Sequence, residues 1–159
     1  MPESQNEFKQ AIKIVLDTNV LVSSLITKKG NCADIIKLVT RQKVQLYYNA
    51  EIFAEYKRVL AYQRLSFTSR ETSPLLNIIL KQGTAFESSK STIKITDEDD
   101  RAFYDTAKQS GSFLVTGNTR HYPKEDFILT PAAFLTKHTE LELPPETAES
   151  AIRRPNLRS

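Results

Sequence analysis

IKIVLDTNVLVSSLI, residues 12–26, is the stretch that decides the fold. Its first five residues, interrupted only by Lys13, form the near-continuous apolar run of a parallel strand that is buried on both faces. Asp17 follows at once, and the apolar residues that resume after Asn19 predict a helix. Because ligands bind at the carboxyl ends of strands in open α/β sheets, Asp17 is a candidate functional residue. The alternative, an ordinary helix cap, stays open on this stretch alone.

Length and composition predict one soluble globular domain. The chain has 159 residues and 18.1 kDa, of which 40% are hydrophobic and 26% charged, and a chain of this length can bury a proper core. The single Cys32 excludes an internal disulfide and a cysteine-rich zinc site, which is typical of a reducing compartment. No apolar segment has the length or position of an export signal or a membrane span, so we expect a cytoplasmic protein. The net charge of +3 permits a polyanionic partner without requiring one.

The rest of the chain alternates strand-like and helix-like segments. Strands are expected at 44–48, 112–116 and 127–129, with weaker β-like runs at 84–90 and 92–95, and helices at 31–42, 50–62, 73–83, 101–111 and 132–138. Asn49 is expected to cap the helix at 50–62, and Gly111 to end the helix at 101–111. We assign residues 1–10 to a flexible N-terminus and residues 11–138 to the single domain. Residues 139–159 contain three prolines and end in RRPNLRS, which predicts a disordered basic tail, with contact to RNA or a partner as the alternative.

Glu55 and two acids near residue 100 are further candidates. Glu55 lies at the rim of the apolar face of its helix, where its carboxylate can reach a cleft or pair with Arg58, and the pattern itself favours the surface ion pair. Asp100 falls within the apolar arc of the helix that begins near residue 100. Its side chain is therefore expected to point inward, where a carboxylate needs a partner or a cation. Asp99 flanks the same arc and ranks second, whereas Asp105 is expected on the solvated face.

The strand expected at 112–116 repeats the design of the first strand, because a polar turn ending in Asn118 follows it directly. On adjacent parallel strands, Asn118 and Asp17 can face one another. The loop TRHYPK, residues 119–124, adds hydrogen-bond donors beside this edge. Its candidates for contact with RNA phosphate are Arg120, His121 and Lys124. A plain solvated loop is an equally good interpretation, and a lone loop histidine does not indicate a metal site.

The acids expected to face the carboxyl edge of the sheet are Asp17, Glu55 and Asp100. Carboxylates of this kind bind Mg²⁺ or Mn²⁺ together with water, and such a site suits the hydrolysis of phosphodiesters. Spacing along the chain does not by itself establish that the three side chains converge.

Taken together, these features resemble the PIN-domain family, and within it the toxin branch related to VapC-type ribonucleases of toxin–antitoxin systems. The matching stretches, from about residue 12 to 135, are VLDTNVLVSSL, AEYKRVL, DEDDRAFYDTA, LVTGN and TPAAFL. The resemblance implies a Rossmann-like three-layer α/β/α fold with a central, mainly parallel sheet. It also implies an endoribonuclease dependent on Mg²⁺ or Mn²⁺ that leaves 5′-phosphate and 3′-hydroxyl ends on RNA. A cognate antitoxin would block such an enzyme, and dimers are common in the family.

Matched motif by motif, the three most regular acids of the family correspond to Asp17, Glu55 and Asp100. The positions that support them are Thr18, Asn19, Ser23, Asp99, Thr116 and Asn118. The fourth acidic position departs from the pattern, because many relatives have Asp where this chain has Asn118, and others place it where this chain has His121. One-metal catalysis, help from Asp99 and low activity therefore stay open.

Three other functions were weighed against the nuclease. The first is a non-catalytic PIN fold that holds RNA or a protein partner, motivated by Asn118. A phosphatase of the haloacid dehalogenase type needs a second Asp two residues after the first, and that residue is Asn19. A P-loop enzyme is excluded, because the four glycines form no G-x-x-x-x-G-K motif.

Overall fold

The computed structural model describes residues 11–142 of the chain. Its strands are β1 (Ile12–Leu16), β2 (Val44–Tyr48), β3 (Thr84–Ala85), β4 (Phe113–Val115) and β5 (Ile128–Leu129). Its α-helices are α2 (Thr18–Ile26), α3 (Asn31–Thr40), α4 (Ala50–Leu60), α5 (Ser69–Gln82), α6 (Arg101–Ser110) and α7 (Pro131–Glu142). Three 3-10 turns, η1 (Gln63–Leu65), η2 (Glu98–Asp100) and η3 (Thr119–His121), complete the described part.

The five strands form one sheet in the order β3-β2-β1-β4-β5, and every neighbouring pair is parallel. β1 is the central strand: Ile14 pairs with Leu46 of β2 on one side and with Phe113 of β4 on the other. The backbone N–H of Asp17 donates to Val115 O at 2.9 Å, which continues the β1–β4 pairing to the ends of both strands. The polar residues that follow β1 and β4 therefore meet at one edge.

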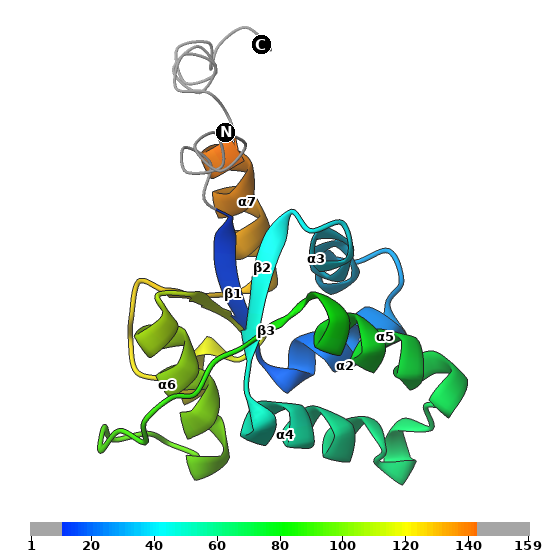
Figure 1. The fold of residues 1–159 in the computed structure, drawn as a ribbon, viewed down its shortest axis with the longest axis horizontal. Coiled ribbons are helices and arrows are strands. Elements are labelled where there is room, and N and C mark those ends of the chain that lie inside the picture. The colour runs from blue at the N-terminus through cyan, green and yellow to red at the C-terminus, as the bar shows by residue number, and fades with distance from the viewer. Residues whose placement is uncertain (1–10, 143–159) are drawn as a thin grey trace, which may run out of the picture.

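Helices cover both faces of the sheet, which gives the expected three-layer α/β/α fold. Figure 1 shows α6 on one side of the sheet and α3 and α5 on the other. α6 packs on β1, β2 and β4, while α3 and α5 pack on β2, and α7 packs on β5 and α3. α4 lies beyond the carboxyl end of β2, with its first turn capped by the Asn49 side chain, which accepts from Ile52 N at 2.9 Å. No helix within residues 11–142 is long and apolar enough to cross a membrane.

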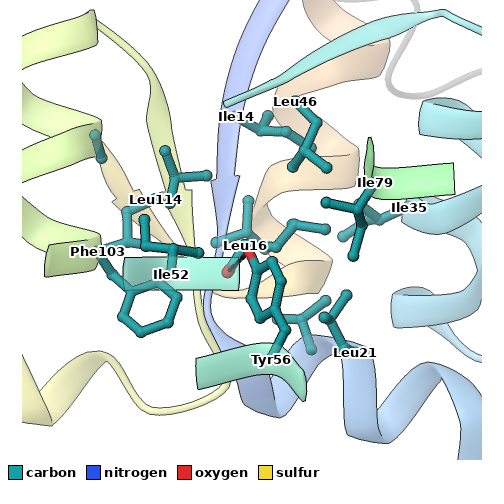
Figure 2. Packing of buried hydrophobic residues seen from close by; sticks show 14 of the residues in the cluster. Ile14, Leu16, Leu21, Ile35, Leu46, Ile52, Tyr56, Ile79, Phe103 and Leu114 are labelled. Carbon is teal, nitrogen blue, oxygen red and sulfur yellow. Dashed lines mark hydrogen bonds between the residues drawn. The ribbon is translucent and has the colours of Figure 1, made fainter. Parts of the chain in front are cut away.

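The core is built around β1, as its apolar sequence predicts. Ile14, Val15 and Leu16 are all fully buried, because helices lie over both faces of the strand. Figure 2 shows Leu16 beside Tyr56, which is also fully buried. The Tyr56 hydroxyl donates to Leu16 O at 2.6 Å, so the end of the strand before Asp17 is fixed by a buried hydrogen bond as well as by packing.

Helix α5 begins at Ser69, four residues before the predicted start. The reason is a capping box: Thr68 and Glu71 satisfy each other's backbone N–H groups at the N-terminus of the helix. The signal was present in the sequence as T-x-x-E at residues 68–71, and Pro74, at the predicted start, lies inside α5. The β-like run at 92–95 was also wrong, because that segment is not a strand.

Asp105 was expected to face solvent and is instead buried, with 3% of its surface exposed. Its carboxylate accepts from Ser91 N at 2.9 Å, and the neighbouring Arg101 donates to Ser91 O at 3.0 Å. The irregular segment before η2 therefore lies over this face of α6, and a helical wheel cannot reveal a cover made by a loop. Gly111 ends α6 as predicted, with φ of +72°. α7 continues to Glu142, so the assigned tail begins in a helix, and its remainder, like residues 1–10, lies outside the described residues.

Candidate active site

Asp17 lies at the carboxyl end of β1 with 8% of its surface exposed. It occupies the N-cap position of α2, but its side chain makes no capping hydrogen bond. Instead Oδ2 accepts from the hydroxyl of Thr116 at 2.8 Å and from the hydroxyl of Tyr122 at 2.9 Å. The simple cap interpretation of Asp17 is therefore wrong, because the carboxylate is held by side chains from beyond the neighbouring strand.

Thr116 connects the ends of β1 and β4. Its side chain is fully buried, and its oxygen accepts from Asn118 N at 3.0 Å and from Asn19 Nδ2 at 3.4 Å. Asn19 in turn accepts from Gly117 N at 2.9 Å through Oδ1. The residues that follow the two strands thus form one hydrogen-bonded unit around the Asp17 carboxylate, and Asn19 and Thr116 both belong to it.

Tyr122 is a site residue that the sequence did not single out. It follows η3, is buried to 7% exposure, and reaches Asp17 through its hydroxyl. Burial, followed by the negative charges of Asp17 and Asp100, raises the pKa of Tyr122 well above its ordinary value. The phenol therefore stays a neutral donor to the carboxylate. The only sequence signal was an aromatic residue in a polar loop after a strand end.

Asp100, in the last position of η2, is the acid coupled most strongly to Asp17. Burial, and then the charge of Asp17, raise the pKa of Asp100 to about 7, with smaller contributions from Asp97, Asp99 and Glu55. His121 places Nδ1 3.8 Å from Oδ2 of the same carboxylate. A carboxyl whose pKa is raised by a second acid marks a place where negative charge is concentrated and a cation is favoured.

Glu55 does not join Asp17 and Asp100 directly in this structure. Its carboxylate pairs with the Arg58 guanidinium one helical turn later, which is the surface ion pair that the helix pattern favoured. Within residues 11–142 no three His, Cys, Asp or Glu side chains are close enough together to hold a metal ion. Glu55 still acts on Asp100 through its charge, and its role as a ligand stays a prediction.

The remaining predicted residues lie around this centre at different depths. Thr18 is buried, and its hydroxyl has no hydrogen-bond partner among the described residues. Ser23 is exposed and lies near the thiol of Cys32 on α3, whose pKa is raised by burial and lowered to a smaller extent by the Ser23 hydroxyl. The exposed members of the predicted set are Asp99, Asn118, Arg120, His121 and Lys124. Of these, Asn118 and His121 contact each other, with the amide nitrogen 3.2 Å from Nδ1.

The family is decided by comparison with known proteins, since the sequence matches the PIN domain over residues 13–120. The protein belongs to the PIN domain family. PIN domains are generally nucleases, and PIN nucleases typically use divalent metal ions. An uncharacterized protein of Methanocaldococcus jannaschii is 33% identical to this PIN domain protein over 117 residues, which cover 69% of the chain and 73% of the relative. No solved structure gives a significant match.

The donor chemistry of this PIN domain suits a hard divalent cation. Both side-chain hydrogen bonds that the Asp17 carboxylate accepts within residues 11–142 go to Oδ2, which leaves Oδ1 for a ligand. Asp100 adds a second carboxylate with a raised pKa. Mg²⁺ is commonly bound through one or two carboxylates and keeps several waters, which fits these two acids.

Proposed function

We propose that the protein is a metal-dependent endoribonuclease in which Asp17 and Asp100 bind Mg²⁺ or Mn²⁺. The observation that carries the proposal is that Asp100 lies within electrostatic reach of Asp17: burial, and then the charge of Asp17, raise the pKa of Asp100 to about 7. A bound divalent cation offsets this repulsion, since it stabilises both ionised carboxylates. The nuclease class is supported by the PIN domain match, and RNA as the substrate by the toxin-branch motifs in the sequence.

A divalent ion at this site would polarise a phosphoryl oxygen and lower the pKa of a bound water. Thr116 and Tyr122 fix the orientation of the Asp17 carboxylate through Oδ2, so that Oδ1 is presented without rearrangement. Asn118 in place of an acid supplies one negative charge fewer, which favours a single ion over two. Glu55, which pairs with Arg58 in this structure, is the third ligand we propose.

The test is cleavage of single-stranded RNA by the purified protein, followed on a gel, with and without Mg²⁺ or Mn²⁺. We expect cleavage that EDTA stops and that Asp17→Asn abolishes, because the variant keeps the shape of the side chain but loses its charge. Asp34→Asn is the matched control, since Asp34 is an exposed acid on α3 that pairs with Lys37 at 3.8 Å. Wild-type rates of cleavage by Asp17→Asn would rule out the metal site.

The second candidate is a PIN fold that binds RNA or a protein without cleaving. The specific observations in its favour are Asn118 at the usual fourth acidic position and the pairing of Glu55 with Arg58. The two candidates separate in one experiment with the wild-type protein and Mn²⁺. Binding of single-stranded RNA without strand scission would support the second candidate, and scission would exclude it.

We further propose that the nuclease is the toxin of a toxin–antitoxin pair that acts in the cytoplasm. A cognate antitoxin protein would be its inhibitor, and the toxin would form homodimers. The support is the order of the matching motifs over residues 12–135. Induced expression should arrest growth, Asp17→Asn should relieve the arrest, and a small neighbouring open reading frame should restore growth when co-expressed. Continued growth under wild-type expression, with RNA cleavage present in vitro, would point to RNA processing instead.

A further inference from the structure

A cavity of about 590 Å³ lies between η3 with the loop that follows it and the start of α7. Its apolar lining includes Pro123, Ile128, Leu129 and Ala133. The exposed side chains of Arg120 and Lys124 also line it. The volume and the lining of this cavity are typical of a site for a small molecule or a nucleotide. In such sites the apolar surface contacts the flat part of the ligand, and a few polar groups orient it.

The charge around this cavity is positive and unpaired. Within residues 11–142 neither Arg120 nor Lys124 forms an ion pair. Glu125 also lines the cavity, but its carboxylate accepts from the Tyr104 hydroxyl and lies 3.5 Å from Lys108 Nζ, so its charge is balanced elsewhere. Two cations without an ion-pair partner among the described residues, at the rim of this cavity, can bind the phosphates of a nucleic acid backbone.

Tyr122 connects the cavity to the proposed active site. Tyr122 is one of the residues that line the cavity, and its hydroxyl donates to Asp17 Oδ2 at 2.9 Å. One residue therefore contacts both the cavity and the Asp17 carboxylate. In a polynucleotide held at Asp17 and Asp100, the chain on the Tyr122 side of the scissile phosphate would run toward this cavity.

We propose that this cavity binds one unpaired nucleotide of single-stranded RNA next to the scissile phosphate, an inference that rests on the proposed nuclease function. The base lies against the apolar lining, and Arg120 and Lys124 hold the adjacent phosphates. A base in a duplex is stacked and paired, so only an unpaired strand can enter the cavity. The site therefore selects single-stranded over duplex RNA.

The test measures binding separately from cleavage, by fluorescence anisotropy of a short fluorescein-labelled single-stranded RNA in EDTA. Replacing both cations, Arg120→Ala with Lys124→Ala, should raise the dissociation constant about 5- to 100-fold. The slope of log affinity against log salt should become shallower by about 0.7 for each phosphate that is no longer neutralised. The matched control is Arg41→Ala with Lys43→Ala, which removes the same charges between α3 and β2, at the opposite edge of the sheet. An equal fall in affinity in both double variants would overturn the proposal.

A second pair of variants tests the cavity itself. Ala133→Leu fills space in the cavity without changing charge, whereas Ala132→Leu adds the same group to a neighbouring exposed position of α7 outside the lining. We expect weaker RNA binding for Ala133→Leu only, with an unchanged salt dependence. Wild-type affinity for Ala133→Leu, or duplex RNA bound as tightly as single-stranded RNA, would overturn the nucleotide site.

The outcomes separate this inference from the function on which it rests. RNA cleavage that depends on Asp17 but not on Arg120, Lys124 or Ala133 contradicts the cavity proposal and leaves the nuclease intact. RNA binding that depends on the cavity in a protein that never cleaves contradicts the nuclease, and it also overturns the cavity as a subsite beside a scissile phosphate.

Discussion

Removing the charge of Asp100 should stabilise the metal-free protein. The pKa of this carboxyl rises from 3.8 to about 7 on folding, and three pKa units correspond to about 4 kcal/mol of electrostatic cost. The side chain is 17% exposed, so solvent screening reduces the cost, and we expect about 2 kcal/mol. Asp100→Asn, which cannot ionise, should gain this amount in the free energy of unfolding at pH 8.

The direction of the pH dependence follows from the number of protons that the folded and unfolded states bind. The folded protein keeps the proton on Asp100 up to about pH 7, whereas the unfolded chain loses it near pH 4. Between these values the folded state binds more protons, so the contribution of Asp100 to stability falls as the pH rises, and above pH 7 the loss is complete. The advantage of Asp100→Asn should therefore be largest above pH 7 and disappear near pH 4.

The assay is urea unfolding of the wild-type protein, Asp100→Asn and the exposed-acid control Asp126→Asn at a series of pH values, with EDTA present. Adding Mg²⁺ should reverse the order, since it stabilises only the protein that keeps both carboxylates. A lower stability for Asp100→Asn than for the wild-type protein at pH 8 without metal would refute the reasoning. So would an advantage that does not change with pH.

Three further predictions concern other contacts of the site and fold. Thr116→Val should lose about 1–3 kcal/mol in urea unfolding and most of the cleavage rate, because a buried hydroxyl that bonds to Asp17 disappears, while Thr116→Ser should keep much of both. Arg58→Gln should strengthen Mn²⁺ binding measured by calorimetry by about two- to fivefold, since it frees Glu55, and unchanged binding would argue against Glu55 as a ligand. Gly111→Ala should cost about 1–2 kcal/mol in thermal unfolding, because φ is +72°, and an unchanged midpoint would contradict this cost.

The sequence by itself determined where several strands and helices lie and where helices begin and end, because local periodicity and capping residues encode these features. The apolar run of residues 12–16 predicted a parallel strand buried on both faces, and β1 is that strand, with Asp17 at its carboxyl end. Asn49 was predicted to cap α4 and Gly111 to end α6, and both do. Such features can be predicted from sequence because each depends only on residues that are close together in the chain.

The tertiary structure alone decided which side chains hold the acids. Thr116 and Tyr122 reach Asp17 across 99 and 105 positions of sequence, and this contact exists because β4 lies beside β1. The orientation of Glu55 toward Arg58 and the burial of Asp105 under an irregular loop were likewise settled by packing. A periodic pattern indicates which face of a helix or strand packs on the sheet. It does not indicate which loop or distant residue covers a given side chain, because strand order and loop paths set those contacts.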